Sequence, residues 1–322
     1  MRLAVPRDLD ARAIAGVDRA ARVVDLAGET MGTVWRVRCA VPAAFDTEAL
    51  RSAIMRRLAG LVAEMSHWEP ESRLSRFNRA AAGTWIKLPR DFATVIAAGL
   101  EIAARSGGAF DPAIGRLIDL WGFGPRPHTH VPSDTEIAAA LSVSGWQRLA
   151  FDRPAGWLRQ PGGVSLDLSG IAKGYAVDAV ARLLREQDVA HALVEIGGEC
   201  LGLGVRPDLD PWWVDIETPP GTDIAPLRVA LHGLAVATSG DYVRGHHTLD
   251  PRTGQPARAV TSLSVLHPSA MLADAWASAL TVLGPDAGAA LAVREGLAVR
   301  CVYRGEAGVR EWLSPALAAM LA

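Results

Sequence analysis

Near the middle of the chain, the stretch Asp167-Leu-Ser-Gly-Ile-Ala-Lys-Gly-Tyr-Ala-Val-Asp178 joins two different sequence patterns. From Val164 to Leu168, apolar and polar residues alternate, which is typical of a half-buried strand. From Ala176 to Leu184, apolar residues recur with helical spacing. The stretch therefore predicts a strand, a tight glycine-containing turn and the first turn of a helix.

The predicted turn could bind an anion. The first turn of a helix leaves backbone N–H groups unpaired and directs the positive end of the helix dipole at one place. Lys173 adds a cation there, and Asp167 lies at the end of the predicted strand. By itself, the segment favours an ordinary strand-to-helix turn with a surface lysine. The other motifs of the chain change that balance.

The composition is that of an ordinary globular protein without a dominant charge. The chain has 322 residues, 50% of them hydrophobic, and a formal net charge of −2, so we expect one large domain or two. This charge provides no basic face for nucleic acid and no polybasic patch for a membrane. Cys39, Cys200 and Cys301 lie far apart without a C-x-x-C motif, which favours small buried thiols over a disulfide framework or a zinc site.

The N-terminal part of the chain carries many charges. Residues 1–24 are expected to form a poorly specified arm, and residues 25–322 the main domain. Residues 1–30 contain no apolar core of signal-peptide length, and no later segment approaches the roughly 20 apolar residues of a membrane span. We therefore expect a soluble, cytoplasmic protein, or a periplasmic one if a leader was trimmed.

Hydrophobic periodicity predicts both helices and strands. We expect helices at 47–66, 91–106 (ending at the glycine C-cap Gly107-Gly108), 269–283 and 286–295, with another opened by the capping box Ser133-x-x-Glu136. We expect strands at 23–40 (a pair turning at Met31-Gly32-Thr33), 147–151, 157–160, 192–196, 213–217, 229–236, 298–303 and 309–313. Because these elements do not alternate in a βαβ rhythm, we predict an α+β fold with largely antiparallel sheets.

Two polar segments hold side chains that could bind a ligand. Residues 67–78 are too rich in charge for a core, and their Trp68 and Phe77 could stack on an aromatic ligand or anchor the loop, with anchoring favoured. His128 and His130 lie in a proline-rich loop and could bind a metal. Without further ligands nearby in the sequence, these two histidines are expected to be solvated.

A carboxylate and a hydroxyl interrupt the apolar helix predicted at 269–283. Asp274 and Ser278 stand four residues apart and so share one helical face. A carboxylate on an apolar face is costly unless it is paired or binds a cation. Two hard oxygen donors suit Mg²⁺ better than a transition metal. An aspartate at the solvent edge with a neutral serine is an equally good interpretation of this pair alone.

His247 is the candidate general base. It precedes Asp250-Pro251 in a loop between predicted strands, and an imidazole titrates near neutral pH. Most of the eight histidines will be structural or exposed, so His247 is a weak candidate by itself.

In combination, these motifs resemble the ApbE family of flavin transferases (FAD:protein FMN transferases). The similar blocks occur in the family order between about residues 25 and 285, and their joint occurrence by chance is very improbable. They are Met31-Gly32-Thr33, Met65 to Asn78, Gly107-Gly108-Ala109-Phe110-Asp111-Pro112, Asp167 to Asp178, Glu195-Ile196-Gly197-Gly198, Thr238-Ser239-Gly240-Asp241-Tyr242, His247 to Pro251, and Ala273 to Ser278.

The resemblance implies a substrate, a metal and a partner. FMN would pass from FAD to a threonine or serine hydroxyl of an acceptor protein, with release of AMP and with His247 as the base. Mg²⁺ would be held by Asp274, the Ser278 hydroxyl and the backbone carbonyl of Gly170. FAD would bind near Met31, Trp68, Asn78, Ala109, Phe110, Asp111, Asp167 and Lys173.

Two departures and two alternatives accompany the resemblance. The family usually has threonine where this chain has Ser278, so the metal site would be looser because serine lacks the β-branch that restricts χ1. Many relatives are exported lipoproteins, whereas this sequence shows neither a leader nor a lipid-anchoring cysteine.

The same site could instead let water attack, as in a FAD pyrophosphatase, and Asn78 lies where relatives differ in this respect. The second alternative is a flavin carrier without catalysis, against which Asp274, His247 and Lys173 argue.

Overall fold

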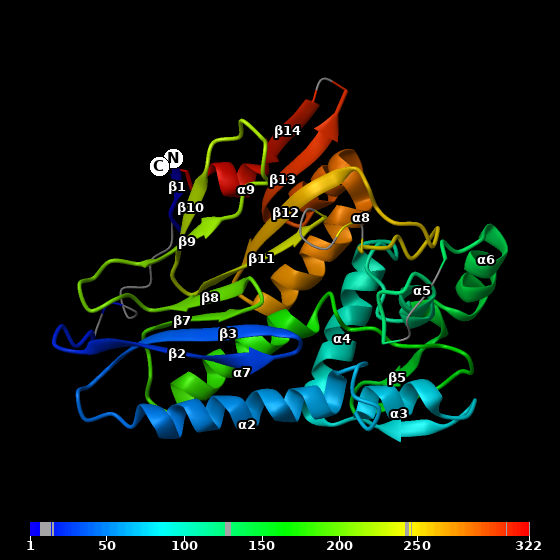
Figure 1. The fold of residues 1–322 in the computed structure, drawn as a ribbon, viewed down its shortest axis with the longest axis horizontal. Coiled ribbons are helices and arrows are strands. Elements are labelled where there is room, and N and C mark those ends of the chain that lie inside the picture. Colours follow the sequence, from blue (N-terminus) through cyan, green and yellow to red (C-terminus); the bar gives the residue numbers. More distant parts are fainter. Residues whose placement is uncertain are drawn as a thin grey trace.

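The computed structural model describes residues 1–6, 14, 16–125, 130–241, 245, 247–306 and 308–321. Its centre is an eight-stranded sheet with the order β14-β13-β12-β11-β8-β7-β3-β2 (Figure 1). Every neighbouring pair in it is antiparallel, which confirms the predicted α+β fold. The strands are β2 (Arg22–Thr30), β3 (Thr33–Val41), β7 (Ala192–Ile196), β8 (Glu199–Leu203), β11 (Leu234–Gly240), β12 (Val260–His267), β13 (Ala298–Gly305) and β14 (Gly308–Leu313).

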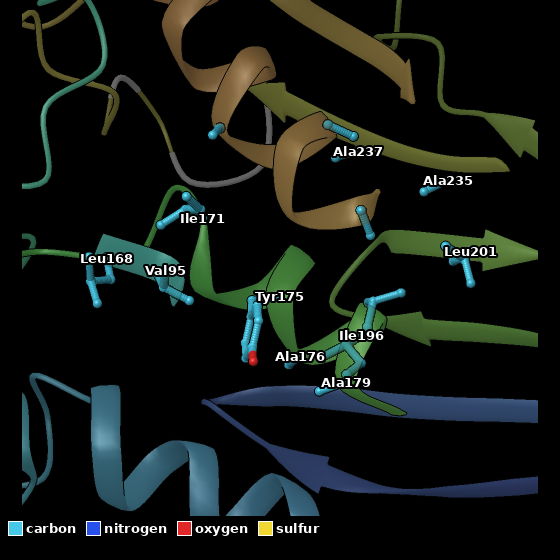
Figure 2. Close-up of a cluster of buried hydrophobic side chains, with 14 of the residues drawn as sticks. Val95, Leu168, Ile171, Tyr175, Ala176, Ala179, Ile196, Leu201, Ala235 and Ala237 are labelled. Carbon is cyan, nitrogen blue, oxygen red and sulfur yellow. The ribbon is translucent and has the colours of Figure 1, made fainter. Parts of the chain in front are cut away.

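Helices cover one face of this sheet. α7 (Ala172–Glu186) and α8 (Ala270–Arg294) pack on the strands and on each other, and α2 (Thr47–Met65) and α4 (Arg90–Arg105) pack on them in turn. Small side chains allow the close approach. Figure 2 shows Ala176 and Ala179 of α7 beside Ile196 of β7, and Ala235 and Ala237 of β11 near α8.

A smaller sheet, β1-β10-β9, covers the opposite face. Strands β1 (Arg2–Ala4), β10 (Leu227–Leu231) and β9 (Trp212–Ile216) form a second apolar cluster with Leu193, Cys200 and Val236 of the large sheet. Because side chains alternate along a strand, Val194 joins the helical core while its neighbour Leu193 joins this second cluster. The predicted arm thus contributes β1 at one end and the start of β2 at the other, and its residues 7–13 and 15 lie outside the described part of the chain.

The remaining elements form a third group beside the sheet. It comprises α3 (Arg73–Arg79), α5 (Gly115–Leu120), α6 (Asp134–Val143), a short 3₁₀ turn (Trp146–Arg148) and the small sheet β4-β6-β5 (Trp85–Lys87, Trp157–Arg159, Ala150–Asp152), while α9 (Pro315–Ala318) lies near the C-terminus. The capping box of α6 is present as predicted.

Three local predictions differ from the structure. Residues 164–168 form no strand, since their backbone groups form hydrogen bonds with the Asn78 side chain and with the loop after Asp111. The single strand expected at 229–236 is two strands, β10 and β11. The polar segment 67–78 contains α3, whose Leu74 and Phe77 are fully buried, so Phe77 does anchor this segment.

Helix α8 passes a length and composition test for a membrane span, although no such span was expected. Half of its most apolar window is buried in the protein, and a core helix passes the same test. Gly284, with a φ of 78°, and Pro285 interrupt it, at the place where the sequence predicted two helices.

Candidate functional site

The predicted anion turn and the predicted carboxylate helix meet at Gly174. A Cβ on this residue would lie 2.2 Å from the Ala270 carbonyl oxygen and 2.8 Å from the Asp274 Cβ, so only glycine permits this crossing of α7 and α8. The Gly174 N–H, in the first turn of α7, donates a hydrogen bond of 3.0 Å to Asp274 Oδ2. A carboxylate therefore lies at the positive end of the α7 dipole.

Asp178, the last residue of the central stretch, fixes the same crossing from α7. Its carboxylate accepts hydrogen bonds from the Ser269 hydroxyl (2.6 Å) and from the backbone N–H groups of Ala270 (2.9 Å) and Met271 (3.1 Å). Asp178 thus caps the N-terminus of α8 from a neighbouring helix.

A pocket of about 710 Å³ opens beside this crossing. Its walls come from the α7 and α8 crossing, the glycine turn between β7 and β8, the end of β11 and the loop that contains His247. Most of the predicted site residues line it, namely Ala109, Phe110, Asp111, Asp167, Gly170, Lys173, His247, Asp274 and Ser278.

Three residues predicted to bind flavin do not line this pocket. Met31, which has a φ of 49° in the β2–β3 turn, lies in a separate groove of about 500 Å³ against α2. Trp68 is 60% exposed beside His67. The Asn78 amide binds both backbone groups of Leu166, at 3.0 and 2.7 Å, and so holds the segment that carries Asp167.

Lys173, Glu199 and Asp274 form a charged cluster in the pocket wall. The Lys173 ammonium donates to Glu199 Oε1, while Glu199 Oε2 is buried without a hydrogen-bond partner among the described residues. Burial raises the pKa of Glu199 to about 7; nearby Lys173 opposes this rise and Asp274 adds to it. Burial also raises the pKa of Asp274, against the lowering effects of Lys173 and the Gly174 N–H.

Two further carboxylates lie in another part of the pocket lining. Burial raises the pKa of Asp111 to about 6, although its carboxylate accepts hydrogen bonds from the N–H groups of Ala113 (2.7 Å) and Trp146 (2.9 Å). Asp167 Oδ2 lies 3.2 Å from His67 Nδ1, and its Oδ1 accepts from the Ser169 N–H. Both carboxylates are held by neighbouring groups, as a preorganised binding site requires.

The ring orientation of His247 suits a base. Its Nδ1 lies 2.9 Å from the Gly245 carbonyl oxygen, which can only accept, so Nδ1 carries the hydrogen. In the neutral ring Nε2 then carries the lone pair. Phe123 packs edge-on against the ring. Tyr242 and His246 of the neighbouring motif, and His128, lie outside the described residues.

The donor set expected for Mg²⁺ is compact but has only one carboxylate. A Cβ on Gly170 would lie 2.7 Å from the Ser278 hydroxyl oxygen, so a side chain there would fill the space in front of it. No group of three or more His, Cys, Asp and Glu side chains in the described ranges could hold a metal. Asp274, Ser278 and the Gly170 carbonyl are hard oxygen donors, which fits Mg²⁺ bound by one carboxylate and completed by substrate phosphates.

Glu199 and His67 were not predicted as site residues from the sequence. Glu199 is the only charged residue in the buried strand β8, directly after Gly197-Gly198, and a lone carboxylate in an apolar strand is the signal that could have found it. His67 precedes Trp68 without any spacing motif, and only the fold brings it to Asp167.

Known proteins resemble this chain over most of its length. Residues 31–301 match the sequence profile of the ApbE family. The FAD:protein FMN transferase of Klebsiella pneumoniae (strain 342) is 34% identical over 305 residues, which cover 90% of this chain and 87% of the relative. The flavin transferase ApbE from Vibrio cholerae has a TM-score of 0.88 and 33% identity, covering 93% of this chain and 99% of that one. The apo form of Pseudomonas stutzeri flavinyl transferase ApbE has a TM-score of 0.87 and 36% identity, covering 93% and 97%.

Proposed function

This chain belongs to the ApbE family, and on that basis we propose that it is an FAD:protein FMN transferase. It transfers FMN from FAD to a serine or threonine hydroxyl of an acceptor protein and releases AMP. The observation that carries the proposal is the meeting of Asp274, Lys173 and the first turn of α7 in one pocket, which His247 also lines.

The diphosphate of FAD binds at the first turn of α7. The Lys173 ammonium and the positive end of the α7 dipole attract the diphosphate, whereas the Ala172 and Gly174 N–H groups of this turn already donate to the Leu168 carbonyl and to Asp274. Asp111 and Asp167, which line the same pocket, provide hydrogen-bond acceptors for the flavin part. Binding in this pocket fixes the reacting phosphorus relative to His247, and such positioning accounts for much of the catalysis of phosphoryl transfer.

Mg²⁺ would be held by Asp274, the Ser278 hydroxyl and the Gly170 carbonyl, where it would supply charge neutralisation for the diphosphate. The chain itself provides the base. His247 Nε2 takes the proton of the acceptor hydroxyl as its oxygen forms a bond to the FMN-side phosphorus. The bond from this phosphorus to the bridging oxygen breaks, and AMP leaves with that oxygen.

Mass spectrometry of the products tests this proposal. The purified protein is incubated with FAD, MgCl₂ and a candidate acceptor flavoprotein. Transfer adds one phosphoester-linked FMN to the acceptor and yields an equal amount of AMP. Free FMN with an unmodified acceptor identifies a pyrophosphatase instead, and unchanged FAD identifies a carrier.

A further inference from the structure

Glu199 has no role in the reaction described so far, yet it is one of the most deeply buried charged residues of the pocket. It is 3% exposed, at the first position of β8. Strand alternation directs Cys200 toward the small sheet, whereas Glu199 faces α7 and meets Lys173 there. Burying a carboxylate costs free energy unless it pairs with a positive charge.

The cluster holds two carboxylates and one ammonium. Lys173 forms an ion pair with Glu199 and also lowers the pKa of Asp274, so one ammonium faces two carboxylates. In this ion pair the Glu199 carboxylate offsets the positive charge of Lys173. The negative charge of Glu199 therefore opposes the binding of a diphosphate and favours that of a divalent cation.

We propose that Glu199 is a positioning residue that holds the Lys173 ammonium beside Asp274 and, through its charge, makes FAD binding depend on Mg²⁺. Without Mg²⁺ the Glu199 charge disfavours the diphosphate. With Mg²⁺ the metal would balance this charge, while the ion pair keeps the Lys173 ammonium beside the phosphates. The role rests on the proposed function only in the place given to the diphosphate and to Mg²⁺.

Removing the Glu199 charge should change the affinities for FAD and for Mg²⁺ in opposite directions. Glu199→Gln keeps the size of the side chain and an oxygen for the Lys173 hydrogen bond, but removes the charge. We expect this variant to bind FAD about tenfold more tightly than the wild type in EDTA, and Mg²⁺ about tenfold more weakly. Lys173→Met should change both affinities in the reverse directions, because it leaves the carboxylates without their cation.

Binding measurements test this without any acceptor. FAD affinity in EDTA is measured by flavin fluorescence, and Mg²⁺ affinity by calorimetry, both at pH 8. Glu186→Gln is the control, since Glu186 is exposed at the last position of α7 and does not line the pocket, and it should leave the Mg²⁺ affinity within about twofold of wild type.

Parallel loss of both affinities in Glu199→Gln would show a merely structural role and overturn the proposal, as would unchanged affinities. Glu199→Asp, which keeps the charge, should retain the Mg²⁺ dependence if the proposal holds. Suppose that Glu199→Gln shows the expected opposite changes in affinity but the wild-type protein modifies no acceptor. This outcome would contradict the transferase function and leave the role of Glu199 intact.

Discussion

At the scale of single residues, the proposed reaction depends on side chains that other groups orient. The Gly245 carbonyl sets which nitrogen of His247 carries the hydrogen, and the Gly174 N–H fixes one oxygen of Asp274. Such hydrogen bonds hold a catalytic group in one geometry and one tautomer.

Replacing His247 by alanine should slow the chemical step. Loss of a general base costs about 10²- to 10⁴-fold in rate, and we expect this loss in single-turnover transfer with FAD affinity nearly unchanged. His130→Ala is the control, because that imidazole is exposed beside Glu136, outside the pocket lining. An unchanged single-turnover rate in His247→Ala would remove this residue from the mechanism.

The ionisation of Asp111 should make the stability of the ligand-free protein depend on pH. Its folded pKa of about 6 lies above the unfolded value of 3.8, so the folded state binds more protons between these values and stability falls as pH rises from about 4 to 6. A shift of about two units corresponds to roughly 3 kcal/mol. Urea unfolding of the wild type and of Asp111→Asn should show this pH-dependent difference in the free energy of unfolding, and parallel pH profiles would contradict it.

At the scale of elements, the crossing of α7 and α8 decides where the functional groups lie. Gly174 lets the helices approach, Asp178 caps α8 from α7, and Asp274 reaches the first turn of α7 as a result. An apolar α8 in the core carries its single buried carboxylate to this point.

Gly174→Ala should therefore destabilise the protein and disturb the site together. The new Cβ would collide with the Ala270 backbone, and overpacking of this kind costs about 1–3 kcal/mol. Gly60→Ala is a matched control at an exposed position of α2, where nothing lies within 4 Å of the added Cβ, and it should be neutral or stabilising by up to about 1 kcal/mol. Urea unfolding gives both values, and equal effects in the two variants would contradict the tight crossing.

At the scale of the whole molecule, the pocket collects segments from most of the chain. Its lining runs from Thr33 to Val282, and the large sheet and its covering helices hold these segments in place. A ligand that bridges them should stabilise the entire fold, because it binds the folded state alone.

FAD together with Mg²⁺ should raise the melting temperature of the wild-type protein. At a ligand concentration of 100 times Kd the expected stabilisation is about 2.7 kcal/mol. In Asp274→Asn the Mg²⁺-dependent part of this shift should disappear while the ligand-free protein stays folded. Differential scanning calorimetry measures both, and a full Mg²⁺-dependent shift in that variant would refute the assignment of Asp274 to the metal site.

Local patterns in the sequence determined most helices, most strands and the α+β class, because periodicity, caps and glycine turns act over a few residues. The motif resemblance pointed to the family and to most residues that line the pocket. Only the tertiary structure decided the rest. It placed Glu199 against Lys173 across 26 positions and Asn78 on Leu166 across 88, and it turned a predicted strand at 164–168 into an irregular segment. These outcomes depend on which distant groups satisfy a buried charge or backbone amide, and no local pattern encodes such pairings.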